Sequence, residues 1–167
     1  MLLLALPTLA PAADELAFCG GCEIEIGIGG TYHYWAKTGG VVVPFILDWS
    51  DARYELGAFR LTTPQWIEFA GQPPARRFAN PYWGYSLSRR WRLWANPSLR
   101  LYFGLGASYK TETDGLDSTH WNFAEQLALR WERHHGPSLE LSIRHWSNAG
   151  IRLPNRGQDF AVLTLVF

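Results

Sequence analysis

The chain has 167 residues, the length of one domain, and its 15 Lys and Arg balance its 15 Asp and Glu. It therefore has no net charge with which to attract nucleic acid or an acidic partner, which argues against a nucleic-acid binder. Nine Trp, seven Tyr and nine Phe are typical of either a soluble core or the aromatic belts of a membrane protein.

The N-terminus has the composition of a secretory signal. The apolar run MLLLAL is followed by the small residues of APAA, and we expect cleavage after Ala12 or Ala13, although no Lys or Arg precedes the run. Residues 1–13 are therefore interpreted as a signal peptide and residues 14–167 as a single domain. No other stretch approaches the roughly 20 apolar residues that a spanning helix needs, so a membrane form of this chain must cross with strands.

The two cysteines stand close together in CGGC, as Cys19 and Cys22. A haem attachment site would place His at position 23, which is Glu23, and a lipoprotein signal would place a small residue at position 18, which is Phe18. A redox CxxC would precede a helix, and no helical pattern follows. We therefore expect either a local disulfide or two unreactive thiols, with no catalytic role.

Alternation of apolar and polar residues predicts eight β-strands separated by clusters of Gly, Pro, Asn and Asp. The expected strands are 23–34, 41–49, 52–62, 79–94, 97–110, 119–133, 137–147 and 158–167. The segment 64–69, PQWIEF, is the one place where a helical turn is expected.

The alternation alone does not show whether the apolar face points inward, as in a soluble barrel or sandwich, or outward, as in a transmembrane barrel. The signal-like start, the aromatic residues near strand ends and the C-terminal Phe167, which resembles the assembly signal of bacterial outer-membrane barrels, favour the membrane. We predict an all-β fold, an eight-stranded antiparallel transmembrane β-barrel of the outer-membrane type. Arg89 and Glu125 fall in apolar series and are expected near a membrane interface.

The polar strand faces would then line the lumen. Their charged residues are expected to pair with one another: Glu23, Glu25, Arg100, Arg130, Glu140 and Arg144. His33 and His120 fall on the same faces and are expected in this polar network, whereas His134 and His135 lie in a turn and are expected to be exposed. Eight strands enclose a lumen that side chains fill, so a pore is not expected.

The end of the strand 137–147 carries two residues of a different kind on its apolar face. Leu139, Leu141 and Ile143 are followed at the same parity by His145 and Ser147, with Cβ atoms about 7 Å apart. An imidazole beside a hydroxyl is what a general base and its nucleophile require.

The last strand supplies an acid. A hairpin that opposes residues 145 and 159 places Asp159 beside His145, where a carboxylate would fix the imidazole tautomer. In the connecting loop, the side-chain amides of Asn148 and Asn155 and the backbone N–H groups near Ala149 and Gly150 are possible oxyanion donors. The simpler alternative is a set of polar residues where a strand leaves the membrane.

The segments HWSNAG and LPNRGQD, which includes Pro154, resemble the outer-membrane lipid A 3-O-deacylase (PagL) family, with its His-aromatic-Ser-Asn-Ala-Gly, then Pro-Asn-x-Gly and an acid. The resemblance is specific in these segments and architectural elsewhere. It implies Ser147 as nucleophile, His145 as base, Asp159 as acid, Asn155 as oxyanion donor and Asn148 as a supporting residue. The family has Glu in place of Asp159, whose carboxylate lies about 1.5 Å further back.

The resemblance implies a serine esterase, a multi-pass barrel in the outer membrane, that removes the 3-O-linked acyl chain from lipid A without a metal or cofactor. Its partners would be lipid A or lipopolysaccharide of the outer leaflet and the outer-membrane assembly machinery, and a homodimer stays open. The alternatives are a non-enzymatic structural or adhesive barrel and a soluble lipocalin-like carrier. The sequence holds no P-loop, GxSxG or HExxH motif.

Overall fold

The computed structural model describes residues 21–32, 36–62, 65–69, 75–78, 81–113, 118–153, 155 and 157–167, with backbone alone for 36–39, 65–69 and 75–78. The expected signal peptide, Cys19, His33 and Pro154 lie outside the described residues. Cys22 lies within them and is disulfide-bonded, in agreement with the first of the two states expected for the cysteines.

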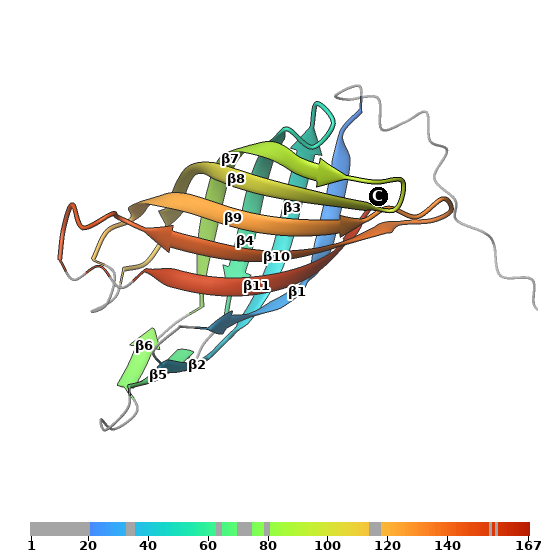
Figure 1. The fold of residues 1–167 in the computed structure, drawn as a ribbon. Helices are drawn as coiled ribbons and strands as arrows, with labels where there is room; N and C mark the ends of the chain where they lie inside the picture. The colour runs from blue at the N-terminus through green and yellow to red at the C-terminus, as the bar shows by residue number, and fades with distance from the viewer. Residues whose placement is uncertain are drawn as a thin grey trace, which may run out of the picture.

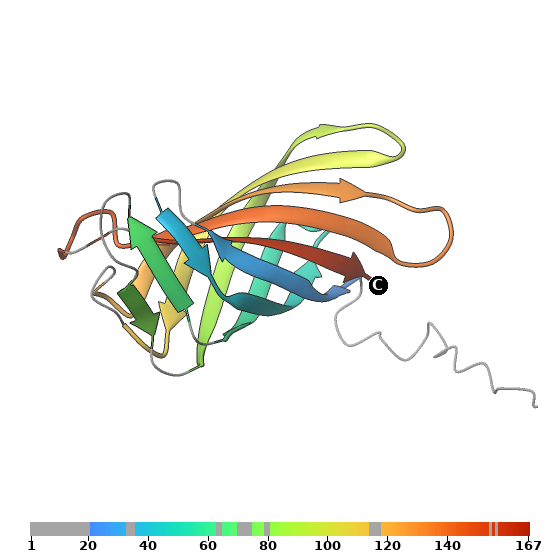
Figure 2. The ribbon, with the colours of Figure 1, turned by 90° about the horizontal axis from the view of Figure 1, so that it is seen from below.

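Eight antiparallel strands close into one barrel (Figures 1 and 2). In order around the barrel they are β1 (Glu23–Tyr32), β11 (Gln158–Val166), β10 (Ser138–Ser147), β9 (Trp121–Trp131), β8 (Leu99–Lys110), β7 (Tyr82–Ala95), β4 (Tyr54–Leu61) and β3 (Val41–Trp49), which pairs again with β1. The predicted fold class and all eight predicted strands are confirmed, with ends that differ by a few residues.

A second, three-stranded sheet lies beyond one end of the barrel (Figure 1) and consists of β2 (Ala36–Gly39), β5 (Gln65–Phe69) and β6 (Ala75–Phe78). The central strand β5 pairs antiparallel with both neighbours, so that Ile67 lies opposite Thr38 and Ala75. The helical turn expected at 64–69 is therefore wrong. Two backbone partners and the β-branched and aromatic residues of QWIEF favour the extended chain.

The apolar face of the barrel strands points outward. Along β9 exposed and buried residues alternate strictly, and on other strands Ile28, Phe45 and Leu87 expose more than half of their surface. Polar residues such as Gln126 and Thr164 are instead buried in the lumen. This arrangement excludes the soluble carrier and makes the chain a transmembrane barrel. Among the described residues there is no helix of the length and hydropathy that crossing a membrane would demand.

The two ends of the barrel differ in their connections. Short turns join β3 to β4, β7 to β8 and β9 to β10, at the end where β11 finishes. The other end carries the connections 33–40, 62–81, 111–120 and 148–157. Outer-membrane barrels direct short turns to the periplasm and long loops outward, so we name the end with the long connections the outer end.

Side chains fill the lumen in two layers. Toward the outer end lies an apolar cluster, beside the buried Lys110 and Gln158, that comprises Val42, Ile46, Phe59, Leu61, Tyr82, Ala124, Trp146, Phe160 and Val162. The layer toward the turn end is charged. Arg144 joins the two, because its guanidinium lies 5.0 Å from the ring of Phe59 and donates to Glu55 at 2.6 Å. The filled lumen matches the expectation that the barrel is not a pore.

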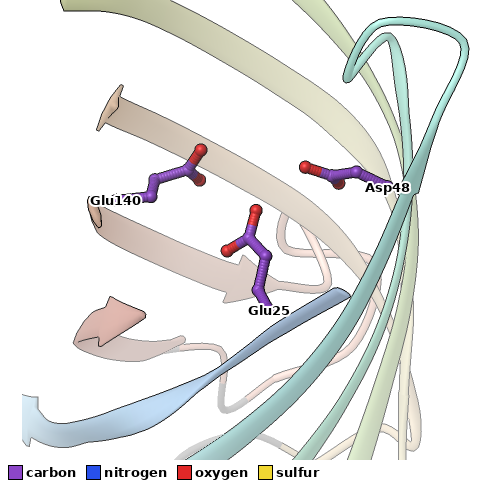
Figure 3. A group of neighbouring side chains, drawn as sticks. All are labelled: Glu25, Asp48 and Glu140. Atoms are coloured by element: carbon purple, nitrogen blue, oxygen red, sulfur yellow. The ribbon is translucent and has the colours of Figure 1, made fainter. Parts of the chain in front are cut away.

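Three buried carboxylates, those of Glu25, Asp48 and Glu140, converge in the charged layer with oxygen atoms within 4.8 Å of one another (Figure 3). Arg90 donates to Asp48 at 2.9 Å and to Glu140 at 2.7 Å. Arg130 donates to all three carboxylates at 2.6 to 2.8 Å. The carboxylates therefore form an ion network with the two arginines, each of which fills several acceptor sites.

The expected pairing of interior charges is confirmed for Arg130, which contacts Glu23 as well as the three carboxylates. It is wrong for Arg100, which pairs with Asp51 and Glu132 at the partly exposed turn end. The predicted position of His120 in the polar network of the lumen is also wrong. It stands just before β9 begins and is exposed, so its ring stacks on Tyr109 outside the lumen.

Replacing Arg130 by leucine is expected to lower the free energy of unfolding by about 3–5 kcal/mol, because its carboxylate partners would stay buried without their cation. Urea titration of the barrel in lipid vesicles, followed by heat-modifiable gel mobility, measures this change. Arg89→Leu is the control, since Arg89 faces outward over the ring of Trp91 and should contribute less than about 1 kcal/mol. Equal effects of the two substitutions would contradict the proposed role of the network.

Candidate active site

The expected base and acid meet on the outer wall of the barrel. The register of β10 and β11 pairs His145 with Asp159, as the sequence predicts. Nδ1 of His145 lies 2.6 Å from Oδ1 of Asp159, the distance of a charge-assisted hydrogen bond. The imidazole is 40% exposed and the carboxylate 13%, so the imidazole is presented to the surroundings and the carboxylate contacts it from the side. An aspartate therefore reaches the imidazole without the extra methylene of glutamate.

Ser147 follows on the same face, at the end of β10 and opposite Phe123 of β9. The residue between the two reactive positions, Trp146, points into the lumen and is buried. Its ring packs edge-on against Phe160, with centroids 4.9 Å apart. Because Phe160 is the chain neighbour of Asp159, this inward packing holds together the two strand ends that carry the outward-facing site.

The loop after β10 is braced by the side chain of Asn148, which is buried. Asn148 donates from Nδ2 to the carbonyl of Arg152 at 2.8 Å and accepts from the N–H of Gly150 at 2.9 Å. Its own N–H donates to Oδ1 of Asn155 at 3.0 Å. Ala149 takes a left-handed conformation, with φ of 53°. The N–H of Gly150 is thus engaged within the loop, and the side chain of Asn155 is held in a fixed orientation.

Gly157 lies directly against the imidazole. Its φ is +67°, and a Cβ at this position would come within 2.5 Å of Cε1 and 3.2 Å of Nε2 of His145. The imidazole therefore occupies the space that a side chain would fill. The sequence shows this glycine in the motif but does not reveal its contact with the base.

If His145 is the base that the sequence predicts, Gly157→Ala is expected to lower the rate of the predicted ester hydrolysis by about 10- to 100-fold, because the new Cβ displaces the imidazole by a fraction of an ångström or more. Gly136→Ala is the matched control. Gly136 also has a positive φ, +77°, but a Cβ there meets nothing within 4 Å, so it carries the backbone strain without the contact. Rates measured on both variants in detergent separate the two effects, and equal losses would refute the role of the contact.

Glu125 of β9 is exposed on the outer wall and lies opposite His145 in the register. The sequence placed it near a membrane interface; the structure brings it beside the base. The sequence contains the information for this contact, because a hairpin whose turn is centred on residue 135 places residue 125 opposite residue 145. A shallow open groove of about 190 Å³ runs here and is lined by Tyr32, Phe103, Glu125, Leu127, Ile143 and His145.

The site lies toward the outer end of the barrel wall. His145 and Ser147 are the last outward residues of β10 before the connection 148–157, and Asp159 is near the start of β11. Apolar residues continue the same face toward the turn end, where Leu141 is 51% exposed and Leu163 is 49% exposed. The candidate site residues thus lie at the rim of the lipid-facing band.

Comparison with known proteins bears on the family and the fold of the chain. The family model described as Lipid A 3-O-deacylase (PagL) matches residues 43–167. No curated protein matches the chain. The fold is similar to the crystal structure of the outer membrane enzyme PagL, with a TM-score of 0.54 and 18% identity over 87% of this chain and 98% of that one. The Yersinia pestis outer membrane protein Ail gives a TM-score of 0.47 and 13% identity over the same shares.

The family match covers more than half of the chain and includes every residue of the candidate site. The similarity to solved structures, at this level of identity, supports the barrel fold. The chain is an outer-membrane β-barrel that belongs to the lipid A 3-O-deacylase (PagL) family.

Proposed function

We propose that the protein is a serine esterase that removes the 3-O-linked acyl chain from lipid A in the outer leaflet. The observation that carries the proposal is the 2.6 Å contact between His145 and Asp159 on a lipid-facing wall, with Ser147 next on the same face. A hydrolytic site in this place meets an acyl ester within the membrane, so the lipid need not be extracted. Membership of the family supports lipid A as the substrate.

In the first half of the proposed reaction, Asp159 holds the proton of His145 on Nδ1, which leaves Nε2 as the base. Nε2 takes the proton of the Ser147 hydroxyl while Oγ attacks the ester carbonyl carbon. The tetrahedral intermediate collapses by breaking the bond to the sugar oxygen, which receives the proton from His145. The acyl chain is then esterified to Ser147.

In the second half, water attacks the acyl-enzyme and gives a proton to His145, which returns it to Oγ of Ser147 as a 3-hydroxy fatty acid leaves. We assign the oxyanion to the side-chain amide of Asn155 and the N–H of Ala149. The hydrogen bonds of the loop support this choice, since the N–H of Gly150 is engaged by Asn148 and Oδ1 of Asn155 is occupied. Asn148 then acts as the brace of the loop.

Mass spectrometry of lipid A from cells that express the protein tests the proposal. The expected result is lipid A that lacks one acyl chain at the 3-position, with an equal amount of free 3-hydroxy fatty acid. Cells with equal amounts of inserted Ser147→Ala protein should keep intact lipid A. Unchanged lipid A in cells with folded wild-type protein would favour the non-enzymatic barrel, and loss of a chain from another position would refute the 3-O assignment.

A further inference from the structure

Glu125 is a carboxylate on a strand face that is otherwise apolar, the outward face of β9. The other outward residues of β9 are Trp121, Phe123, Leu127, Leu129 and Trp131, and all of them are exposed. No residue in the described part of the chain donates a hydrogen bond to the Glu125 carboxylate. A charged group in this position is costly, and ionisable residues at membrane depth are by default functional. Among the described residues the carboxylate is thus free to accept a hydrogen bond from a bound molecule.

Glu125 is adjacent to the reactive residues but is not the acid of the triad. It lies directly across from His145, which for opposed strands places the Cβ atoms about 4.5–5.5 Å apart. Asp159 is on the other side of His145 and already holds Nδ1 at 2.6 Å. The tautomer of the base is thus set without Glu125, which remains available to a bound lipid.

The position of Glu125 along the barrel axis shows which part of a lipid it would meet. Ser147 lies opposite Phe123, whereas Glu125 is two residues further from the outer end. A group at Glu125 is thus on the membrane side of the nucleophile, where the acyl chain runs, and not on the side of the sugar. Beyond it the groove is lined by apolar side chains, including Phe103 and Leu127.

We infer that Glu125 accepts a hydrogen bond from a hydroxyl group on the acyl chain close to the ester carbonyl, and that it selects hydroxyacyl esters as the substrate class. This inference rests on the proposed esterase function. A hydroxyl on the third carbon of the chain starts about 2.5 Å from the carbonyl carbon. Glu125 is the diagonal neighbour of Ser147, which places their Cβ atoms about 7–8 Å apart. The length of the glutamate side chain and a short O–H···O⁻ bond of about 2.6 Å span this distance.

Two synthetic esters of the same alcohol and chain length test the inference, one with a hydroxyl on the third acyl carbon and one unsubstituted. We expect the folded wild-type barrel, in mixed micelles, to show a kcat/KM about 10- to 100-fold higher for the hydroxyacyl ester. Glu125→Leu should lose this preference and hydrolyse the unsubstituted ester at about the wild-type rate. Glu125→Gln, which keeps an acceptor oxygen, should retain part of the preference. Arg89→Leu removes another outward charge and should leave both rates unchanged.

The outcomes separate the inference from the function on which it rests. Hydrolysis of both esters that depends on Ser147 but shows no preference would overturn the role of Glu125 and leave the esterase intact. An equal loss on both esters in Glu125→Leu, with a shifted pH profile, would overturn it as well, because Glu125 would then act through His145. Failure of the folded wild-type protein to hydrolyse either ester would instead overturn the esterase function itself.

Discussion

Ser147→Ala should lower the rate of ester hydrolysis by the purified barrel by a factor on the order of 10³ to 10⁶, because the proposed mechanism forms the acyl-enzyme on the Ser147 hydroxyl. His145→Ala should cost a similar factor, and the double variant little more, since the two residues act as one unit. Release of fatty acid from a micellar ester measures the rates. Heat-modifiable gel mobility shows that each variant is folded.

The control for this experiment is Ser138→Ala, on the same strand but at the turn end, where the hydroxyl contacts Glu132. Its activity should stay within about twofold of wild type, since it lies away from the site. A serine-directed organophosphorus probe should label the wild type and Ser138→Ala but not Ser147→Ala. Undiminished labelling of Ser147→Ala would place the nucleophile elsewhere.

Asp159→Asn should reduce kcat by about 10³- to 10⁴-fold, because an amide cannot stabilise the imidazolium and presents a donor to Nδ1 of His145. The Nδ1 to Oδ1 distance of 2.6 Å leaves no room for a longer side chain in the same rotamer. Asp159→Glu, which restores the acid of the family, should therefore be about tenfold less active than wild type.

The two substitutions at position 159 separate two requirements: Asp159→Asn removes the negative charge of the side chain, and Asp159→Glu changes the distance between the carboxylate and the imidazole. Full activity in Asp159→Asn would remove the carboxylate from the mechanism. Activity in Asp159→Glu equal to or above that of wild type would show that the imidazole and the acid are further apart during catalysis than in the resting barrel. Steady-state rates on one micellar ester, with folding verified for each variant, decide between these results.

The candidate site was predictable because it depends on neighbours in sequence. The period of two assigns His145 and Ser147 to one face, and a single hairpin brings Asp159 opposite His145. The same reasoning, applied to the turn before β10, would have placed Glu125 at the other side of the base. These contacts follow from the alternation of side chains and the register of adjacent strands.

The interior was less predictable, because its contacts join strands that are distant in sequence and across the barrel. Arg90 of β7 donates to Asp48 of β3 and to Glu140 of β10, and which residues meet depends on the shear of the closed barrel. The contact between Gly157 and the His145 imidazole is also invisible in the sequence, since it depends on a loop conformation. The strand β5 was missed because its pairing partners lie in long connections.

The placement of His145 and Ser147 on the side wall has a kinetic consequence for the proposed esterase. A site that opens laterally encounters substrates by diffusion in the plane of the leaflet, in two dimensions. The rate of turnover then depends on the mole fraction of the substrate among the lipids of the leaflet. It does not depend directly on the molar concentration of substrate in the whole solution. Detergent that dilutes the lipid within a micelle would slow such an enzyme at constant total substrate.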